Sequence, residues 1–281
     1  MALYGAFFLY PVLMTFYNSF HTLRADFGFK TEFVGFANFA EILGEDVIFH
    51  RAVLNTLTWG VAAALLEILL GLALAVFLYF RVPLHRFFRV LWFTPVLMSY
   101  PVVGIIWLWY FNYDWGAINS LLRLVGLGAM AQSWLSTPAT ALPSLIVVTT
   151  WMWTGFNMVV LLAALHAIPQ EYVDGARVDG AGFRQVVLSI LVPLARPTIV
   201  NLMILSFIGK MKQFALVWVM TRGGPLWATE TVATYVVKRA FHWRTFDLGY
   251  PSAIAVIWFV IVLALSLLLT RMLQRRELIQ Y

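Results

Sequence analysis

The sequence predicts an all-α, polytopic membrane protein. Hydrophobic residues make up 62% of its 281 residues, charged residues make up only 11%, and the mean hydropathy is +0.84. A soluble globular domain is nearer to half apolar and a quarter charged, and one soluble core of this size cannot hide the excess. A lipid bilayer is therefore the solvent that this composition fits.

Six apolar runs are long enough to cross a membrane, and the whole chain, 1–281, is predicted to form one transmembrane domain. The first run lacks the basic start and the small-residue cleavage site of a signal peptide, so we interpret it as a helix. The loop His21–Arg51 is mixed in character and contains a short amphipathic helix near Phe36–Leu43. The predicted spans are Ala2–Phe20, Leu54–Phe80, Phe87–Phe111, Ala139–Ala167, Leu194–Met220 and Ala253–Met272.

Lysine and arginine in the loops predict the orientation of these helices. An even number of spans puts both termini on one side. One face carries nine basic residues in short segments against the helix ends, and the other carries eight. Because the positive-inside rule is strongest for such short segments, we expect the face with nine, and both termini, in the cytoplasm. The nine are Arg81, Arg86, Arg89, Arg177, Arg184, Arg196, Arg271, Arg275 and Arg276; the eight are Arg24, Lys30, Arg51, Arg123, Arg222, Lys238, Arg239 and Arg244.

The sequence indicates no catalytic, metal or nucleic-acid site. A phosphate-binding P-loop needs Gly, four residues and then Gly-Lys-Ser/Thr, but Gly209-Lys210 is followed by Met211 and Ile204 stands at the first glycine position. The absence of cysteine excludes disulfides and thiol chemistry, and the scattered histidines lack metal-ligand spacing. The net charge of +6 is spread along the chain, which excludes a basic nucleic-acid stripe. An intramembrane hydrolase is a minor alternative.

An island of charge and glycine, Ile168–Pro197, interrupts the apolar chain, and we call this segment the elbow. Prolines bracket it, and small residues alternate with acids and bases in its first part. We expect the elbow to lie on the cytoplasmic face and to receive force from another subunit. Its predicted contact residues are Glu171, Asp174, Gly175, Ala176, Asp179, Gly180, Ala181 and Gly182.

Polar side chains at membrane depth mark a second predicted site, because such residues are costly and usually face a cavity or a partner. In the fifth span Ser206, Lys210 and Gln213 are spaced i, i+4, i+7 and would share one helical face. The alternative is that Lys210 and Lys212 lie near the outer end and extend to the interface.

The fourth span combines aromatic rings with hydrogen-bonding neighbours, a combination suited to stacking on a sugar and pairing with its hydroxyls. The alternative is ordinary helix packing with tryptophans at the membrane interface. The residues of interest are Thr149, Trp151, Trp153, Phe156 and Asn157. In the second span, Glu67 is a lone acid that could pair with a lysine that the sequence does not identify.

The elbow resembles the EAA loop of binding-protein-dependent ABC importer permeases. That signature has Glu-Ala-Ala, a glycine and Ile-x-Leu-Pro, and the elbow matches its spacing throughout. The departures are Asp for Glu, Gly for the first Ala and Val for Leu, which keep charge sign, smallness or apolarity. The matching residues are Asp174-Gly175-Ala176, Gly180 and Ile190-Leu191-Val192-Pro193.

Other stretches are similar to the carbohydrate-uptake branch of this family, the maltose- and glycerol-phosphate-type permeases. The similarity extends over nearly the whole chain. One departure is Phe214-Ala215, where the family often has Phe-Asp. The matching stretches are Leu165–Ala181, Val34–Phe39, Asn55-Thr56, Trp107–Asn119, Met220–Pro225 and Ala228–Thr231.

This resemblance implies the type I ABC importer permease fold, with a cytoplasmic coupling helix in the elbow. It implies a second homologous permease, two cytoplasmic ATPase subunits carrying ATP and Mg²⁺, and an extracytoplasmic solute-binding protein. The chain itself would bind no cofactor and would lie in the plasma (inner) membrane of a bacterium or archaeon.

The implied cargo is a sugar or oligosaccharide. Substrate contacts in maltose-type relatives come from the fourth and fifth spans. Carried onto this chain, they fall at Thr149, Trp151, Trp153, Phe156, Ser206, Lys210 and Gln213, beside Asn157. A cationic site formed by Lys210 and Lys212 would instead suit an acidic cargo. The rival classes are an ion-gradient secondary transporter and a non-transporting membrane scaffold.

Overall fold

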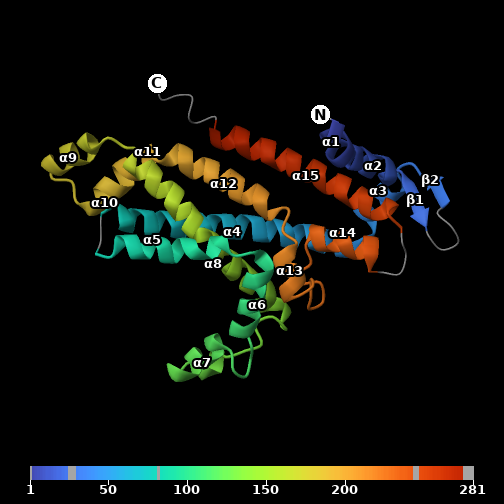
Figure 1. Cartoon of the computed structure of the whole chain (residues 1–281), viewed down its shortest axis with the longest axis horizontal. Coiled ribbons are helices and arrows are strands. Elements are labelled where there is room, and N and C mark those ends of the chain that lie inside the picture. The colour runs from blue at the N-terminus through green and yellow to red at the C-terminus, as the bar shows by residue number, and fades with distance from the viewer. Residues whose placement is uncertain (1, 25–29, 81–82, 243–246, 275–281) are drawn as a thin grey trace. The chain divides into compact units, whose positions relative to one another are not determined.

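The computed structural model describes residues 2–24, 30–80, 83–242 and 247–274 (Figure 1). The described chain divides into two compact units, each built from segments far apart in sequence. The hairpin unit contains Met1–Thr58, Trp109–Pro143 and Met211–Leu265, and the elbow unit contains Trp59–Leu108, Ser144–Lys210 and Ser266–Tyr281. Four arginines used to predict the orientation lie outside the described residues: Arg81, Arg244, Arg275 and Arg276.

The hairpin unit begins with a helix in three successive segments, α1 (Ala2–Tyr4), the π-helical η1 (Gly5–Leu9) and α2 (Tyr10–Ser19). Next comes an antiparallel hairpin of β1 (His21–Arg24) and β2 (Lys30–Phe33), in which His21 pairs with Phe33. The sequence did not indicate this hairpin. The amphipathic helix expected near Phe36–Leu43 is confirmed as α3 (Ala37–Gly44).

The second predicted span is confirmed as α4 (Val47–Tyr79), which begins in the hairpin unit seven residues earlier than expected. The carboxylate of Asp46 accepts a 2.8 Å hydrogen bond from the backbone N–H of Phe49, so it caps the helix and fixes this start. The remaining elements of the hairpin unit are α7 (Ala117–Leu124), η3 (Gly128–Met130), α13 (Ala215–Met220), α14 (Val232–Phe241) and the start of α15 (Gly249–Gln274).

Polar contacts fasten α4 to the loop before α14. The Asn55 amide donates to the backbone carbonyls of Trp227 and Glu230 at 2.9 and 3.0 Å. The hydroxyls of Tyr235 and Tyr250 donate to one oxygen of Asp46 at 2.5 and 2.7 Å. Burial raises the pKa of the Tyr235 hydroxyl, and its hydrogen bond to Asp46 raises that pKa further, because the neutral hydroxyl is the form that donates.

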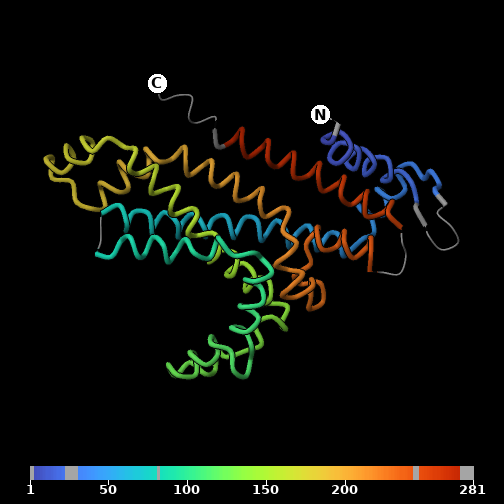
Figure 2. The backbone as a smooth tube through the Cα atoms, in the orientation of Figure 1, coloured from blue at the N-terminus to red at the C-terminus, as the bar shows by residue number. Residues whose placement is uncertain are grey.

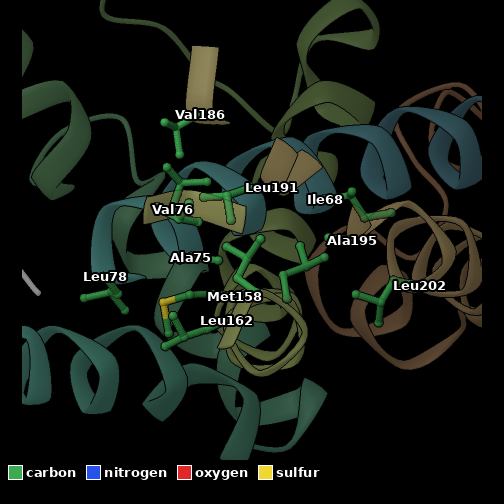
Figure 3. Packing of buried hydrophobic residues seen from close by; sticks show 13 residues of the cluster. Ile68, Ala75, Val76, Leu78, Met158, Leu162, Val186, Leu191, Ala195 and Leu202 are labelled. Atoms are coloured by element: carbon green, nitrogen blue, oxygen red, sulfur yellow. The ribbon is translucent and has the colours of Figure 1, made fainter. Parts of the chain in front are cut away.

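The elbow unit packs helices from both halves of the chain around one apolar core (Figure 3). Ile68, Val76 and Leu78 of α4 meet residues of α8 (Pro138–His166), among them Met158 and Leu162. The other elements are α5 (His85–Phe93), η2 (Thr94–Leu97), α6 (Tyr100–Tyr110), α9 (Gln170–Val178), α10 (Phe183–Val186), η4 (Val187–Leu191), α11 (Val192–Leu194) and α12 (Arg196–Lys210).

The third predicted span, Phe87–Phe111, is not one straight helix. The segments His85–Leu97 and Tyr100–Tyr110 meet at 106°. Met98 between them has an extended backbone, and Pro95 and Pro101 each remove a backbone donor, so the helical hydrogen bonds cannot continue through this point.

The fifth predicted span, Leu194–Met220, is also interrupted. Helix α12 ends at Lys210, residues 211–214 are not helical, and α13 follows. At its start, α12 meets the preceding segment Phe183–Leu194 at 64°. Among the described residues, three helices are long and apolar enough to cross a membrane, or up to five if each bent pair is one span.

Candidate functional site

A buried ion pair lies in the elbow unit between α4 and α12. The Lys210 ammonium is 2.8 Å from one carboxylate oxygen of Glu67 and 3.1 Å from the other. Glu67 is 0% exposed and Lys210 is 4% exposed. The lone acid of the second span thus pairs with this lysine, and the alternative interpretation, in which Lys210 extends to the interface, is wrong.

Ser206 completes this cluster, because its hydroxyl donates to Glu67 at 2.5 Å. Ser206 and Lys210 are four residues apart on α12, so both point from one helix face towards the acid of α4. The cluster holds one negative and one positive charge, and its formal charges cancel.

Aromatic residues form the wall beside the ion pair. The indole N–H of Trp153 donates to the Tyr100 hydroxyl at 2.8 Å, which fixes the indole in place. The Lys210 ammonium lies 5.1 Å from the centre of the Trp153 ring, within cation–π range. Phe156 packs edge-on against Trp153 with ring centres 5.8 Å apart.

These side chains open onto a cavity of about 230 Å³, which we call the Trp153 cavity. Aromatic faces, two hydroxyls, an amide and a compensated ammonium line it, a mixture that can stack on a ring and pair with hydroxyls. Its lining residues are Tyr100, Trp153, Phe156, Asn157, Leu202, Leu205, Ser206, Gly209 and Lys210.

The cavity brings together five of the eight residues expected along a substrate path: Trp153, Phe156, Asn157, Ser206 and Lys210. Thr149 is buried elsewhere on α8, and its hydroxyl has no hydrogen-bond partner among the described residues. Trp151 packs edge-on against Trp107, with ring centres 5.5 Å apart. The expectation that Gln213 continues the stripe of α12 is wrong, because that helix ends at Lys210.

Sequence reasoning missed four lining residues, Tyr100, Leu202, Leu205 and Gly209, and Tyr100 is the aromatic one among them. It stands at the first position of α6, directly after the bend in the third predicted span. Two prolines inside that apolar run, Pro95 and Pro101, are the signal that could have indicated a bend there. Gly155 shapes the same region: a Cβ there would collide with the backbone carbonyl of Trp92, so only glycine allows this close approach to α8.

The elbow presents six of its eight predicted contact residues on the surface of the same unit, whereas Ala176 and Ala181 are half-buried and pack against the apolar core. Val173 of α9 and Val186 of α10 are buried in the core and anchor the elbow, while Glu171, Asp174 and Asp179 are exposed. The hydroxyl of Tyr79, at the end of α4, donates to the Gln170 side chain at 3.3 Å.

Three glycines of the elbow, Gly175, Gly180 and Gly182, add no side chain to this surface. Two of them also end or begin helices. Gly180 has φ +84°, and the N–H of Ala181 donates to the carbonyl of Ala176, which is the glycine-dependent close of a helix. The N–H of Gly182 donates to the Gln185 side chain at 2.9 Å. A Cβ at Gly175 would meet nothing within 4 Å, so that glycine leaves open surface.

Comparison with known proteins decides the family. Residues 67–278 match the family described as "Binding-protein-dependent transport system inner membrane component". The chain belongs to this family. It is therefore an integral membrane permease of an ABC transport system, as the elbow motif predicted.

Curated relatives resemble this permease over nearly its whole length. The probable ABC transporter permease protein YurN of Bacillus subtilis is 32% identical, covering 93% of this chain and 90% of the relative. The sulfoquinovosyl glycerol transport system permease protein SmoG of Agrobacterium fabrum is 30% identical, covering 96% and 86%. The trehalose/maltose transport system permease protein MalF of Thermococcus litoralis is 30% identical, covering 93% and 86%.

A solved structure shows the same fold. A chain of a bacterial ABC transporter involved in the import of the acidic polysaccharide alginate superposes with a TM-score of 0.84. The match covers 100% of this permease and 93% of that chain at 21% sequence identity. The permease therefore has the fold of ABC importer transmembrane subunits.

Proposed function

We propose that this permease moves a sugar or oligosaccharide from an extracytoplasmic binding protein into the cytoplasm by alternating access. The observation that carries the proposal is the Trp153 cavity, where aromatic faces and hydrogen-bonding groups meet. Relatives named for sulfoquinovosyl glycerol and trehalose/maltose transport support a carbohydrate cargo. In this proposal residues 1–281 act as one transmembrane domain.

The ion pair favours an uncharged cargo. A free ammonium in the cavity would suit an acidic sugar, but Glu67 lies 2.8 Å from Lys210 and cancels its charge. Bringing a second carboxylate beside this acid would cost free energy, because like charges repel strongly in a desolvated site. Trp153 instead offers a flat apolar face, and Ser206 and Asn157 offer groups that pair with hydroxyls.

In this proposal, two cytoplasmic ATPase subunits that carry ATP and Mg²⁺ supply the energy for transport. One docks on the elbow of this permease, and the other docks on the elbow of a second homologous permease. The exposed acids and the open surface at Gly175 support this docking role. Closure on ATP would move the elbow as a rigid body, and α12, which holds Lys210, follows it directly in the chain. The closure must favour the outward-facing state by a few kcal/mol to shift the populations decisively.

The proposed setting is the plasma (inner) membrane of a bacterium or archaeon, with six spans and both termini in the cytoplasm. Arg86 and Arg89 on α5 and Arg177 and Arg184 in the elbow belong to the set of basic residues expected on the cytoplasmic face, and all four are exposed. The two alternatives, an ion-gradient secondary transporter and a non-transporting membrane scaffold, lack the ATPase that family membership implies.

Uptake into proteoliposomes tests the cargo proposal. The complex, isolated from its native host by a tag on this permease, is reconstituted with ATP and its binding protein. Labelled maltotriose and a labelled galacturonic acid trisaccharide are the neutral and acidic probes, within a wider panel of oligosaccharides. We expect ATP-dependent uptake of neutral members of the panel.

Matched tryptophan variants place the cargo within the permease. Trp153→Leu should reduce uptake by about tenfold or more, because the stacking face is lost, a change of about 1.4 kcal/mol or more. Trp151→Leu removes the same volume from a residue outside the cavity lining and should retain most of the uptake. Equal losses in the two variants, or uptake of acidic probes only, would contradict the proposal.

A further inference from the structure

Hydrogen bonds around the Trp153 cavity fix what its polar groups can still offer to a cargo. A group that is already committed to one partner in one role keeps only its remaining roles. Three polar side chains of the lining have such commitments: Tyr100, Asn157 and Ser206. In each case the direction of the bond is certain, because the partner can only donate or can only accept.

Tyr100 is left as a donor. It begins α6, directly after the bend of 106° in the chain (Figure 2). The indole N–H of Trp153 can only donate, so the Tyr100 hydroxyl accepts this 2.8 Å bond and keeps its own proton for another partner. No acceptor for that proton lies among the residues that the structure describes. Because the half-buried side chain lines the cavity, an oxygen atom of the cargo can accept this proton.

Asn157 and Ser206 are left as acceptors. The amide nitrogen of Asn157 donates to the backbone carbonyl of Trp153 at 3.1 Å, which fixes the orientation of the amide. Asn157 is 2% exposed and lines the cavity, and its amide oxygen has no hydrogen-bond partner in the described chain. The Ser206 hydroxyl gives its proton to Glu67 and keeps its lone pairs. A buried acceptor without a donor costs free energy, so a cargo hydroxyl that donates to it is favoured.

We propose that Tyr100 determines cargo specificity by donating to an oxygen atom of the sugar ring that stacks on Trp153, while Asn157 accepts from a hydroxyl of that ring. Ser206 is a second acceptor. This inference rests on the proposed function, a sugar bound in this cavity. The volume of about 230 Å³ is below the roughly 300 to 1,000 Å³ of pockets for drug-sized ligands, so these groups act on about one sugar ring. The substrate class is a neutral sugar whose bound ring has free hydroxyl groups, because a methylated or acetylated oxygen cannot donate.

Uptake of modified sugars by the reconstituted complex tests this assignment. The probes are labelled maltotriose and derivatives in which one hydroxyl is replaced by hydrogen or by fluorine. Hydrogen removes both roles of the hydroxyl, whereas fluorine removes the donor and keeps a weak acceptor. The binding protein is the same in every measurement, so comparing each permease variant with the wild type cancels its own preference. If another neutral oligosaccharide of the panel is taken up faster, that one replaces maltotriose.

The two roles predict different patterns. At the position bound by Tyr100, hydrogen should reduce wild-type uptake about fivefold and fluorine should reduce it less. Tyr100→Phe should reduce uptake of the unmodified sugar about fivefold, and hydrogen at that position should then cause no further loss. At the position bound by Asn157, hydrogen and fluorine should reduce wild-type uptake equally, by about fivefold or more, and neither should cause a further loss in Asn157→Leu.

The derivatives also separate recognition from a structural role of Tyr100. If Tyr100 only held the Trp153 indole in place, Tyr100→Phe would reduce uptake of every probe by the same factor, and that result would overturn the inference. Tyr110→Phe, on the same helix but outside the cavity lining, is the matched control and should leave uptake of all probes unchanged. Failure of the wild-type complex to take up any neutral oligosaccharide would overturn the proposed function itself, and the inference with it.

Discussion

Replacing Glu67 with Gln should destabilise the permease by about 3 to 5 kcal/mol, because the variant leaves the Lys210 ammonium buried without a counter-charge. The geometry supports a penalty of this size. Two unit charges 2.8 Å apart attract by about 6 kcal/mol at an effective dielectric constant of about 20. Lys210 is only 4% exposed, so water cannot replace the lost carboxylate without local rearrangement.

Thermal unfolding of the purified complex measures this effect. At about 2 to 4 °C per kcal/mol, Glu67→Gln should lower the midpoint by about 6 to 20 °C. The double variant Glu67→Gln/Lys210→Met should recover more than half of that loss, because it removes the uncompensated charge. Glu171→Gln, an exposed acid of the elbow, is the control and should change stability by no more than about 0.5 kcal/mol.

The reasoning would be refuted if the double variant lost as much stability as the single variants Glu67→Gln and Lys210→Met lose when their separate losses are added. Such additivity would mean that Glu67 and Lys210 do not interact energetically, despite a separation of 2.8 Å. The cavity would then hold a free ammonium, and the preference for an uncharged cargo would lose its physical basis.

Two further predictions concern the elbow and the hairpin unit. Gly175→Phe should abolish stimulation of transport by ATP and leave insertion intact, whereas Gly175→Ala should retain transport, since only the larger side chain obstructs a docking surface that is open at this position. Tyr235→Phe should cost about 1.5 to 3 kcal/mol, the usual value of a hydrogen bond to a charged group, because Asp46 loses a buried donor. This cost should be constant from pH 6 to 9, because the tyrosine hydroxyl is neutral at every pH below the ordinary tyrosine pKa of about 10. The folded state raises the pKa of Tyr235, so the cost should decrease only as the pH rises through that folded-state pKa.

Each of these predictions has a direct check. For Gly175, ATP hydrolysis and uptake are measured on the same vesicles, and normal uptake with the Phe variant would exclude docking at this position. Gly180 is a poorer test site, because its φ of +84° strains any side chain regardless of docking. For Tyr235, unfolding midpoints are compared at both pH values, and a penalty that shrinks between pH 6 and 9 would contradict the assignment.

Composition and local signals were enough to predict the class of fold. Apolar runs predicted α4, α8 and α15 because a span needs only length and hydropathy, and the elbow was visible because its charges and glycines interrupt such runs. The bend at Met98 was not predicted, although Pro95 and Pro101 mark it, because hydropathy averages ignore backbone donors.

The candidate site was only partly predictable. Ser206 and Lys210 were found because four residues separate them on one helix, and such spacing is local. Their partner Glu67 lies 143 residues away from Lys210, and only the packing of α4 against α12 brings the two together. Gln213 was wrongly added to the stripe because residues 211–214 carry no proline or other strong signal for the end of α12.

Alternating access of the Trp153 cavity is the central claim, and the lack of cysteine in the chain allows a direct measurement. Gly209 lines the cavity and has open space around it, so Gly209→Cys places a single thiol there. A membrane-impermeant maleimide should label this thiol from the elbow side without nucleotide, and from the opposite side when ATP and vanadate trap the closed ATPases. Labelling from the same side in both states, or a switch of sides that persists in Gly175→Phe, would contradict the account.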